Sequence, residues 1–124
     1  MKPKRPVNLD IGTIDLPLAA LTSITHRITG IVLFAAIAVL LYLLNQSLVS
    51  EQGFVHVHTI IGSTASRLIL WVILSALGYH MVAGCKHLLM DIGIGESGTG
   101  GPTGARITVA LSSVLALIAG IWLW

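Results

Sequence analysis

Three long apolar stretches, separated by polar segments, dominate the pattern of the chain. Together with their apolar neighbours they approach the roughly 20 residues that a helix needs to cross the hydrocarbon core of a bilayer. Pro17 has a fixed backbone angle that suits a first helical turn, so we expect the first helix to begin just after it. The pattern therefore predicts an all-α membrane protein with three transmembrane helices, at about residues 18–46, 60–91 and 105–124.

The segments that connect these helices carry polar residues and glycine. Residues 45–66 read NQSLVSEQGFVHVHTIIGSTAS, and we interpret them as a loop in which His56 and His58 are solvated rather than metal ligands. Residues 91–105 read DIGIGESGTGGPTGA, and this density of glycine is typical of a flexible turn rather than a folded insertion. No internal repeat is visible, so residues 1–124 are expected to form a single transmembrane anchor domain.

Composition supports a membrane environment and excludes several function classes. The 124 residues are 55% hydrophobic and only 10% charged, against about 25% charged in soluble domains. The formal net charge is +2, and no basic run interleaved with aromatic residues suggests nucleic acid as a partner. Cys85 is the only cysteine, which excludes an internal disulfide and favours a small buried thiol.

Basic residues are distributed unevenly between the two predicted sides of the membrane, and basic residues favour the inner side. Six of the seven flank the start of the first helix or the second connecting loop, and Arg67 lies on the other side: the six are Lys2, Lys4, Arg5, Arg27, Lys86 and Arg106. No short apolar segment with a cleavage site follows the N-terminus, so residues 1–17 are expected to be retained. The predicted location is a bacterial inner membrane, with this segment in the cytoplasm.

A compact polar patch is predicted at the inner end of the first helix, in the sequence SITHRITG. Ser23, His26, Arg27 and Gly30 are spaced i, i+3, i+4 and i+7, so they share one helical face. One interpretation is that Arg27 only extends to the lipid headgroups and helps to set the topology. The other is a binding site, because a serine donor beside a fixed positive charge suits a ligand that gains negative charge.

The second helix carries a deeper polar face in GYHMVAGCKHLLMDIG. His80, Gly84, His87 and Asp91 are spaced i, i+4, i+7 and i+11. His80 lies roughly 9 Å along the helix from Lys86, at 1.5 Å per residue, and so inside the hydrocarbon region. An ionisable residue at that depth marks a functional site by default, although a histidine that is merely hydrogen-bonded to a neighbouring helix is the alternative.

Neutral imidazole is a common haem-iron ligand, and His80 has surroundings that favour this role. Gly84, one turn away, removes side-chain bulk where a flat macrocycle could lie. Zinc is less favoured because no second and third ligand are predicted at the same depth. His26 and His87 lie nearer the inner surface, where haem propionates would point. A second axial ligand would then come from another membrane chain, so a partner is implied.

Three stretches resemble a known family, the cytochrome b subunit of bacterial succinate dehydrogenase. They are RPVNLD near the start, SITHRITG on the first helix and HMVAGCKHLLMDIG on the second. The resemblance covers nearly the whole chain and includes Thr29 beside the residues already named. Lys86 stands where the family usually has arginine and Cys85 where it usually has an aliphatic residue. A lysine is a point charge, so a two-pronged contact at position 86 is not expected.

The resemblance implies a fold, a set of cofactors and a set of partners. This subunit would form half of a heterodimeric haem-binding helix bundle, holding haem b together with a second anchor subunit and docking a flavoprotein and an iron-sulfur subunit on the inner face. The chain would not be catalytic by itself but would help to form the site where ubiquinone is reduced. His80 would be an axial haem ligand, Ser23 and Arg27 would bind the quinone, and His26, Arg27 and His87 would lie near the haem propionates.

Two alternatives remain open from the sequence. The first is the membrane anchor of a fumarate reductase or of another quinone-linked dehydrogenase, because the direction of electron flow is not encoded in this chain. The second is a structural membrane subunit without a cofactor, in which the two polar faces only pack helices together. The concentration of ionisable residues on the inner half disfavours this second alternative, since plain helix packing does not require them.

Overall fold

The computed structural model describes residues 11–95 and 98–124, which are predominantly helical. A short 3-10 helix, η1 (Ile11–Thr13), precedes four α-helices, which are α1 (Leu18–Val49), α2 (Glu51–Ile61), α3 (Thr64–Asp91) and α4 (Gly100–Leu123). Lys2, Lys4, Arg5 and Pro6 lie outside the described residues. The placement of the three basic residues on the inner side of the membrane therefore stays a prediction.

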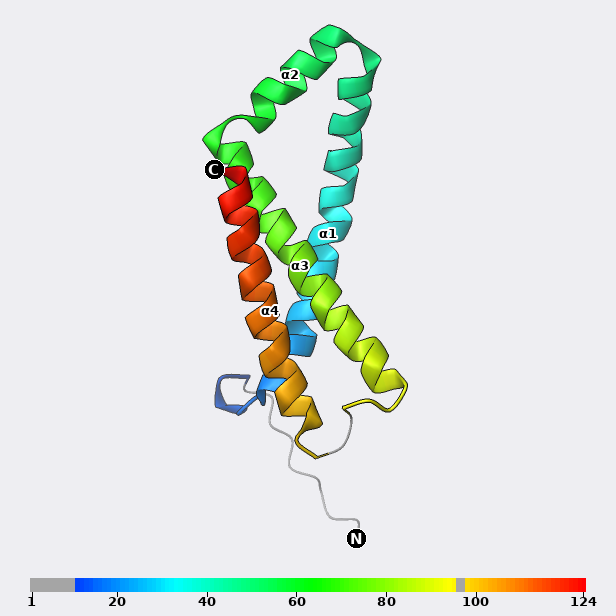
Figure 1. Ribbon diagram of the computed structural model, residues 1–124, viewed down its shortest axis with the longest axis vertical. Coiled ribbons are helices and arrows are strands. Elements are labelled where there is room, and N and C mark those ends of the chain that lie inside the picture. Colours follow the sequence, from blue (N-terminus) through cyan, green and yellow to red (C-terminus); the bar gives the residue numbers. More distant parts are fainter. Residues whose placement is uncertain (1–10, 96–97) are drawn as a thin grey trace.

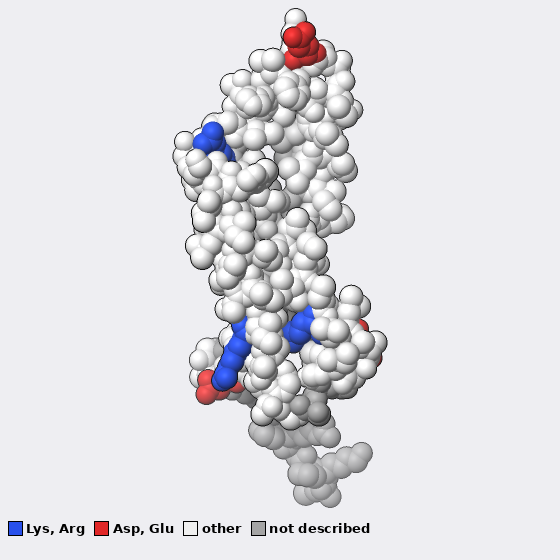
Figure 2. Space-filling model, viewed as in Figure 1, with Lys and Arg blue, Asp and Glu red and all other residues white. Residues whose placement is uncertain are grey.

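Three of the helices, α1, α3 and α4, are long and apolar enough to cross a membrane. The predicted all-α membrane architecture with three spans is therefore confirmed. Large apolar side chains such as Phe34 and Ile121 are exposed, as expected where lipid replaces water as the solvent. On the face drawn in Figure 2, charged side chains gather toward the two ends of the bundle and leave an uncharged band between them.

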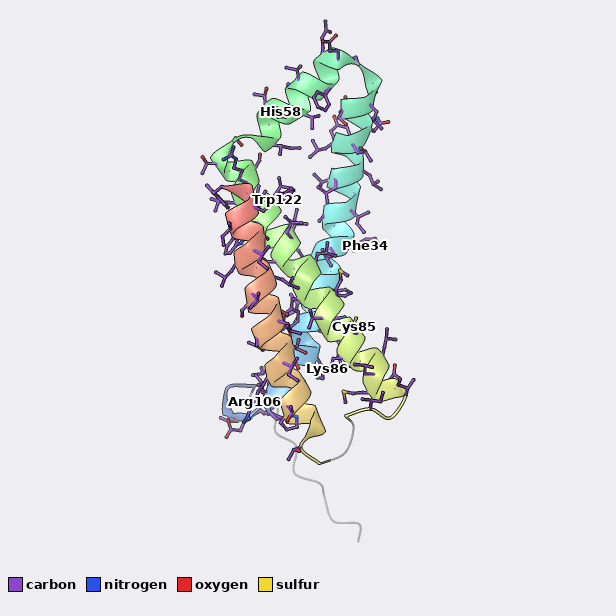
Figure 3. The ribbon with its side chains drawn as sticks, in the orientation of Figure 1. Phe34, His58, Cys85, Lys86, Arg106 and Trp122 are labelled. Atoms are coloured by element: carbon purple, nitrogen blue, oxygen red, sulfur yellow. The ribbon has the colours of Figure 1, made fainter. Side chains whose placement is uncertain are left out.

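The helices α1 and α3 are central to the arrangement, because each of them contacts the other three α-helices. Figure 1 shows α3 crossing α1, α4 running beside α3, and α2 joining the far end of α1 to the start of α3. We call the end where α1 and α4 begin and α3 finishes the basic end, since Arg27, Lys86 and Arg106 belong to these segments. Figure 3 shows Lys86 and Arg106 near this end and Trp122 near the opposite one.

The helix α2 corrects the expectation that residues 45–66 form a loop. α1 continues to Val49, and after Ser50 the chain turns directly into α2. The Ser50 hydroxyl accepts a hydrogen bond from the Gly53 N–H at 3.0 Å, which caps the new helix. The predicted loop includes FVHVH, whereas in the structure these residues follow a capped start and form an amphipathic helix.

The second correction concerns the glycine-rich segment before α4. The turn uses left-handed backbone angles at Gly93, Gly95 and Gly98, with φ of 84°, 76° and 59°, which only glycine adopts at little cost. However, α4 begins at Gly100 rather than near residue 105. Pro102 is tolerated there because the N–H groups of a first turn have no partner within the helix.

Small side chains allow α4 to pack closely against the bundle. Ala105, Thr108 and Ser112 form a stripe at i, i+3 and i+7, with only 0%, 1% and 7% of their surfaces exposed. The two hydroxyls bond back to carbonyls of α4 itself. Small residues at such positions let helix backbones approach one another in a membrane, where apolar burial gives little driving force.

An apolar groove of about 950 Å³ lies between α3 and α4 and includes Cys85, Lys86 and Trp122 in its lining. Cys85 is exposed, which corrects the expectation of a buried thiol. The helical period explains this difference, since Cys85 lies two positions from the buried Ala83 and therefore points to another side of α3. The groove does not include the histidines of α1 and α3.

Candidate functional site: a histidine cluster where two helices cross

Three histidines from α1 and α3 come together toward the basic end of the bundle. The ring of His26 stacks on that of His80, with centroids 4.1 Å apart and planes at 19°. The ring of His87 lies 5.2 Å from that of His26 and is tilted by 48°. All three side chains are half-buried. The structure thus brings together His26 from the polar face of α1 with His80 and His87 from the polar face of α3.

The hydrogen bonds of His80 define its tautomer. Nδ1 lies 3.1 Å from the backbone carbonyl oxygen of His26, and a carbonyl oxygen can only accept. Nδ1 must therefore carry the proton and donate it in this contact. The neutral ring then has its lone pair on Nε2, and no hydrogen bond to Nε2 is formed within residues 11–95 and 98–124. This is the arrangement in which a histidine binds a metal through Nε2.

Gly30 allows the ring of His80 to lie close to α1 at this crossing. A Cβ atom on Gly30 would lie 3.2 Å from Cε1 of His80, which is tighter than ordinary van der Waals contact. A Cβ atom on Gly84 would lie 3.5 Å from Nε2 of His26, at ordinary contact distance, so the structure has room for a small side chain there. The absence of a side chain at Gly30 therefore leaves room for the imidazole ring of His80.

Ser23 and Arg27 lie on the same helix as His26 but are not drawn into the histidine cluster. The Ser23 hydroxyl donates to the carbonyl of Ala19 at 3.1 Å. Arg27 is exposed, and within the described part of the chain it forms no hydrogen bond or ion pair. Its guanidinium group is therefore available to a ligand, a lipid headgroup or another chain.

A second polar link between α1 and α3 was missed by the sequence analysis. The Tyr79 hydroxyl donates to the backbone carbonyl of Thr22 at 3.0 Å, and Nζ of Lys86 lies 3.5 Å from the Thr22 hydroxyl. Thr22 itself is buried. The signal was present in the sequence, because Tyr79 and Lys86 are seven residues apart and share one face of α3.

The two remaining histidines lie on one helix but do not face each other. They are His56 and His58, which are two residues apart on α2. His58 instead stacks on Phe54, with ring centroids 6.2 Å apart. In the described residues no group of three or more histidine, cysteine or carboxylate side chains could hold a metal ion. A site at His80 would therefore supply one ligand from this chain, which suits the iron of a haem better than zinc.

Comparison with known proteins gives one consistent result. The family model of the succinate dehydrogenase/fumarate reductase transmembrane subunit matches residues 1–119. The chain is 38% identical to the succinate dehydrogenase cytochrome b556 subunit of Coxiella burnetii over 100% of both chains. It is 34% identical to the subunit of the same name from Paracoccus denitrificans, over 92% of this chain and 88% of the relative. The chain therefore belongs to the family of transmembrane subunits of succinate dehydrogenase and fumarate reductase.

Proposed function

We propose that the chain is the haem-binding membrane anchor of a succinate dehydrogenase and that His80 is an axial ligand of haem b. The observation that carries this proposal is the Nδ1 hydrogen bond of His80 to the carbonyl of His26 at 3.1 Å, which leaves Nε2 as the free nitrogen. The similarity to subunits named cytochrome b556 supports the identity of the group. When bound, haem b accepts and releases single electrons.

The other haem ligand would come from a second anchor subunit. His26 and His87 lie beside His80 in one group of rings, so His80 would be the ligand from this chain and a residue of another chain would complete the site. Arg27, His26 and His87 are better suited to the propionates, since all three can donate hydrogen bonds to a carboxylate when charged.

Ser23 and Arg27 would form part of the site where ubiquinone is reduced. Reduction places negative charge on the quinone oxygens, so a hydroxyl donor and a fixed positive charge stabilise the product best in a site with little water. Arg27 is exposed and unpaired among the described residues, which supports such a role. The Ser23 hydroxyl would have to rotate away from the Ala19 carbonyl in order to donate to a quinone oxygen.

The flavoprotein and iron-sulfur subunits would dock at the basic end, which would face the cytoplasm of a bacterium. Arg27, Lys86 and Arg106 belong to this end and Arg67 to the other. An excess of basic residues on one side favours that side as the inner one. Electrons from succinate would then reach the quinone and the haem from the side on which Ser23 and Arg27 lie.

The experiment that tests this function is His80→Leu in the complex, co-expressed with its partner subunits. We expect the reduced-minus-oxidised spectrum of the purified complex to lose its b-type haem band, because leucine offers no lone pair to the iron. His56→Leu on α2 is the matched control and should retain the band. A full haem band in an assembled His80→Leu complex would remove His80 as the ligand.

A further inference from the structure

The hydroxyl group of Thr29 lies at the contact between His80 and α1. It is 2.9 Å from the carbonyl oxygen of His26 and 3.2 Å from Nδ1 of His80. The same Nδ1 is 3.1 Å from that carbonyl oxygen. The three polar groups therefore form a closed set, in which each lies within hydrogen-bond distance of the other two.

The chemistry of these groups assigns every proton in the set. The His26 carbonyl can only accept, so it receives hydrogen bonds from both the Thr29 hydroxyl and Nδ1–H of His80. Since the Thr29 proton is used in this way, its oxygen is left to accept from the same Nδ1–H. The Nδ1–H of His80 is thus shared between two acceptors, one from the backbone and one from a side chain.

The hydroxyl contacts of Thr29 differ from those of Thr59 and Thr108. Hydroxyls in membrane helices commonly bond back to a carbonyl of their own helix, and Thr59 and Thr108 make only that contact. Thr29 makes it too, but it also reaches across to a ring on α3, 51 positions further along the chain. Bonding to a carbonyl of its own helix does not account for the contact of Thr29 with His80.

Gly30 limits where the ring can lie. A Cβ atom at this position would come within 3.2 Å of Cε1 of His80, so the ring lies directly against the backbone of α1. The ring of His26 lies on the same imidazole, at 4.1 Å between centroids. His80 is therefore fixed in position by packing from α1 and in rotation by the two acceptors at Nδ1.

We propose that Thr29 is a positioning residue for the haem ligand: its oxygen is a second acceptor for Nδ1–H of His80, beside the His26 carbonyl that sets the tautomer, and it limits rotation of the ring whose Nε2 would bind the iron. The proposal rests on the proposed function, since it assumes that His80 binds haem. A histidine whose N–H bonds to a good acceptor is a stronger electron donor to its metal, and such an outer contact typically changes metal affinity by about 10-fold or more. Thr29 would therefore also stabilise the oxidised iron.

The test compares Thr29→Val, which keeps the shape of the side chain but has no hydroxyl, with Thr29→Ser, which keeps the hydroxyl. In the assembled complex we expect Thr29→Val to shift the haem midpoint potential to more positive values and to lower the haem affinity by about 10-fold. Thr29→Ser should have the native haem midpoint potential and the native haem affinity. Thr25→Val, one turn earlier on α1, should leave both unchanged, because Thr25 is not hydrogen-bonded to His80.

Each outcome bears on the proposal. A native potential and native haem content in Thr29→Val would overturn it, provided that His80→Leu has lost its haem. If Thr29→Val does not assemble, Thr29→Ala takes its place, and a native potential there would overturn the proposal equally. If His80→Leu retains its haem, the ligand assignment itself fails and the proposal fails with it, so the two failures are distinguishable.

Discussion

The two sides on which α3 meets its neighbours use polar groups in different ways. Toward α1, imidazole rings and hydroxyls cross between the helices, and His80 retains a free Nε2. Toward α4, among the described residues, the polar contact that crosses runs from Nε1 of Trp71 to the carbonyl of Ala116 at 2.8 Å. The hydroxyls of Thr108, Ser112 and Ser113 bond within α4.

This difference indicates that the α1–α3 contact is suited to binding a ligand and the α3–α4 contact to packing. An imidazole with one nitrogen fixed and the other free can bind a ligand directly, whereas a hydroxyl bonded within its own helix, such as that of Ser23 or Ser112, must first rotate away from its carbonyl. The contact between α1 and α3 is therefore expected to control the chemistry, and the contact between α3 and α4 is expected to control stability. Four substitutions test this division, from the largest expected effect to the smallest.

Arg27→Gln should have the largest effect, on quinone reduction. The loss of a fixed charge near the developing negative charge is expected to lower succinate:quinone activity by about 100-fold, while succinate oxidation by a soluble dye persists. Arg67→Gln, at the opposite end of the bundle, is the control and should behave as the native complex does. Unchanged quinone activity in Arg27→Gln would contradict the assignment of Arg27 to the quinone site.

Ala105→Leu should act on the packing of α4 against its neighbouring helices, where Ala105 has 0% of its surface exposed. Overpacking at a fully buried position is expected to destabilise the assembled subunit by about 2 kcal/mol, seen as a lower Tm of the complex. The haem spectrum of the molecules that assemble should be native. Ala110→Leu, at an exposed position on the same helix, should leave Tm unchanged. A changed haem spectrum in Ala105→Leu, with a native Tm, would show that the packing of α4 affects the chemistry rather than the stability.

Ser23→Ala should lower quinone reduction by about 10-fold, as expected when a hydrogen bond to a charged oxygen is removed. Dye-linked succinate oxidation should stay intact. Ser113→Ala is a matched control, because Ser113 also donates to a carbonyl four residues earlier in its own helix. Equal loss of both activities in Ser23→Ala would indicate failed assembly rather than a quinone contact.

Trp71→Phe should have the smallest effect. It removes the hydrogen bond to the Ala116 carbonyl, and contacts of this kind between membrane helices contribute about 0.6 kcal/mol on average. A slightly lower Tm with an unchanged haem spectrum is expected. Trp122→Phe, on an exposed side chain, controls for the loss of the indole ring itself. An altered haem potential in Trp71→Phe would show that the α4 side also affects the chemistry.

The amino-acid sequence by itself determined the three spans and the family, and it predicts that His80 lies deep in the membrane. Each follows from properties of one segment at a time: apolar length, helical rise, or a local motif such as SITHRITG. The sequence also allowed the residues of each polar face to be grouped. The family assignment from these motifs is confirmed, whereas the roles of Ser23, Arg27 and His80 stay predictions.

Only the tertiary structure decided how those faces meet. The helical period fixes which residues of one helix point the same way, but not how far one helix is rotated or shifted against another. The stacking of His26 on His80, the bond from Thr29 and the link from Tyr79 to Thr22 all depend on that rotation. The prediction of a loop over residues 45–66 is wrong, because α1 continues to Val49 and the Ser50 hydroxyl caps the start of α2.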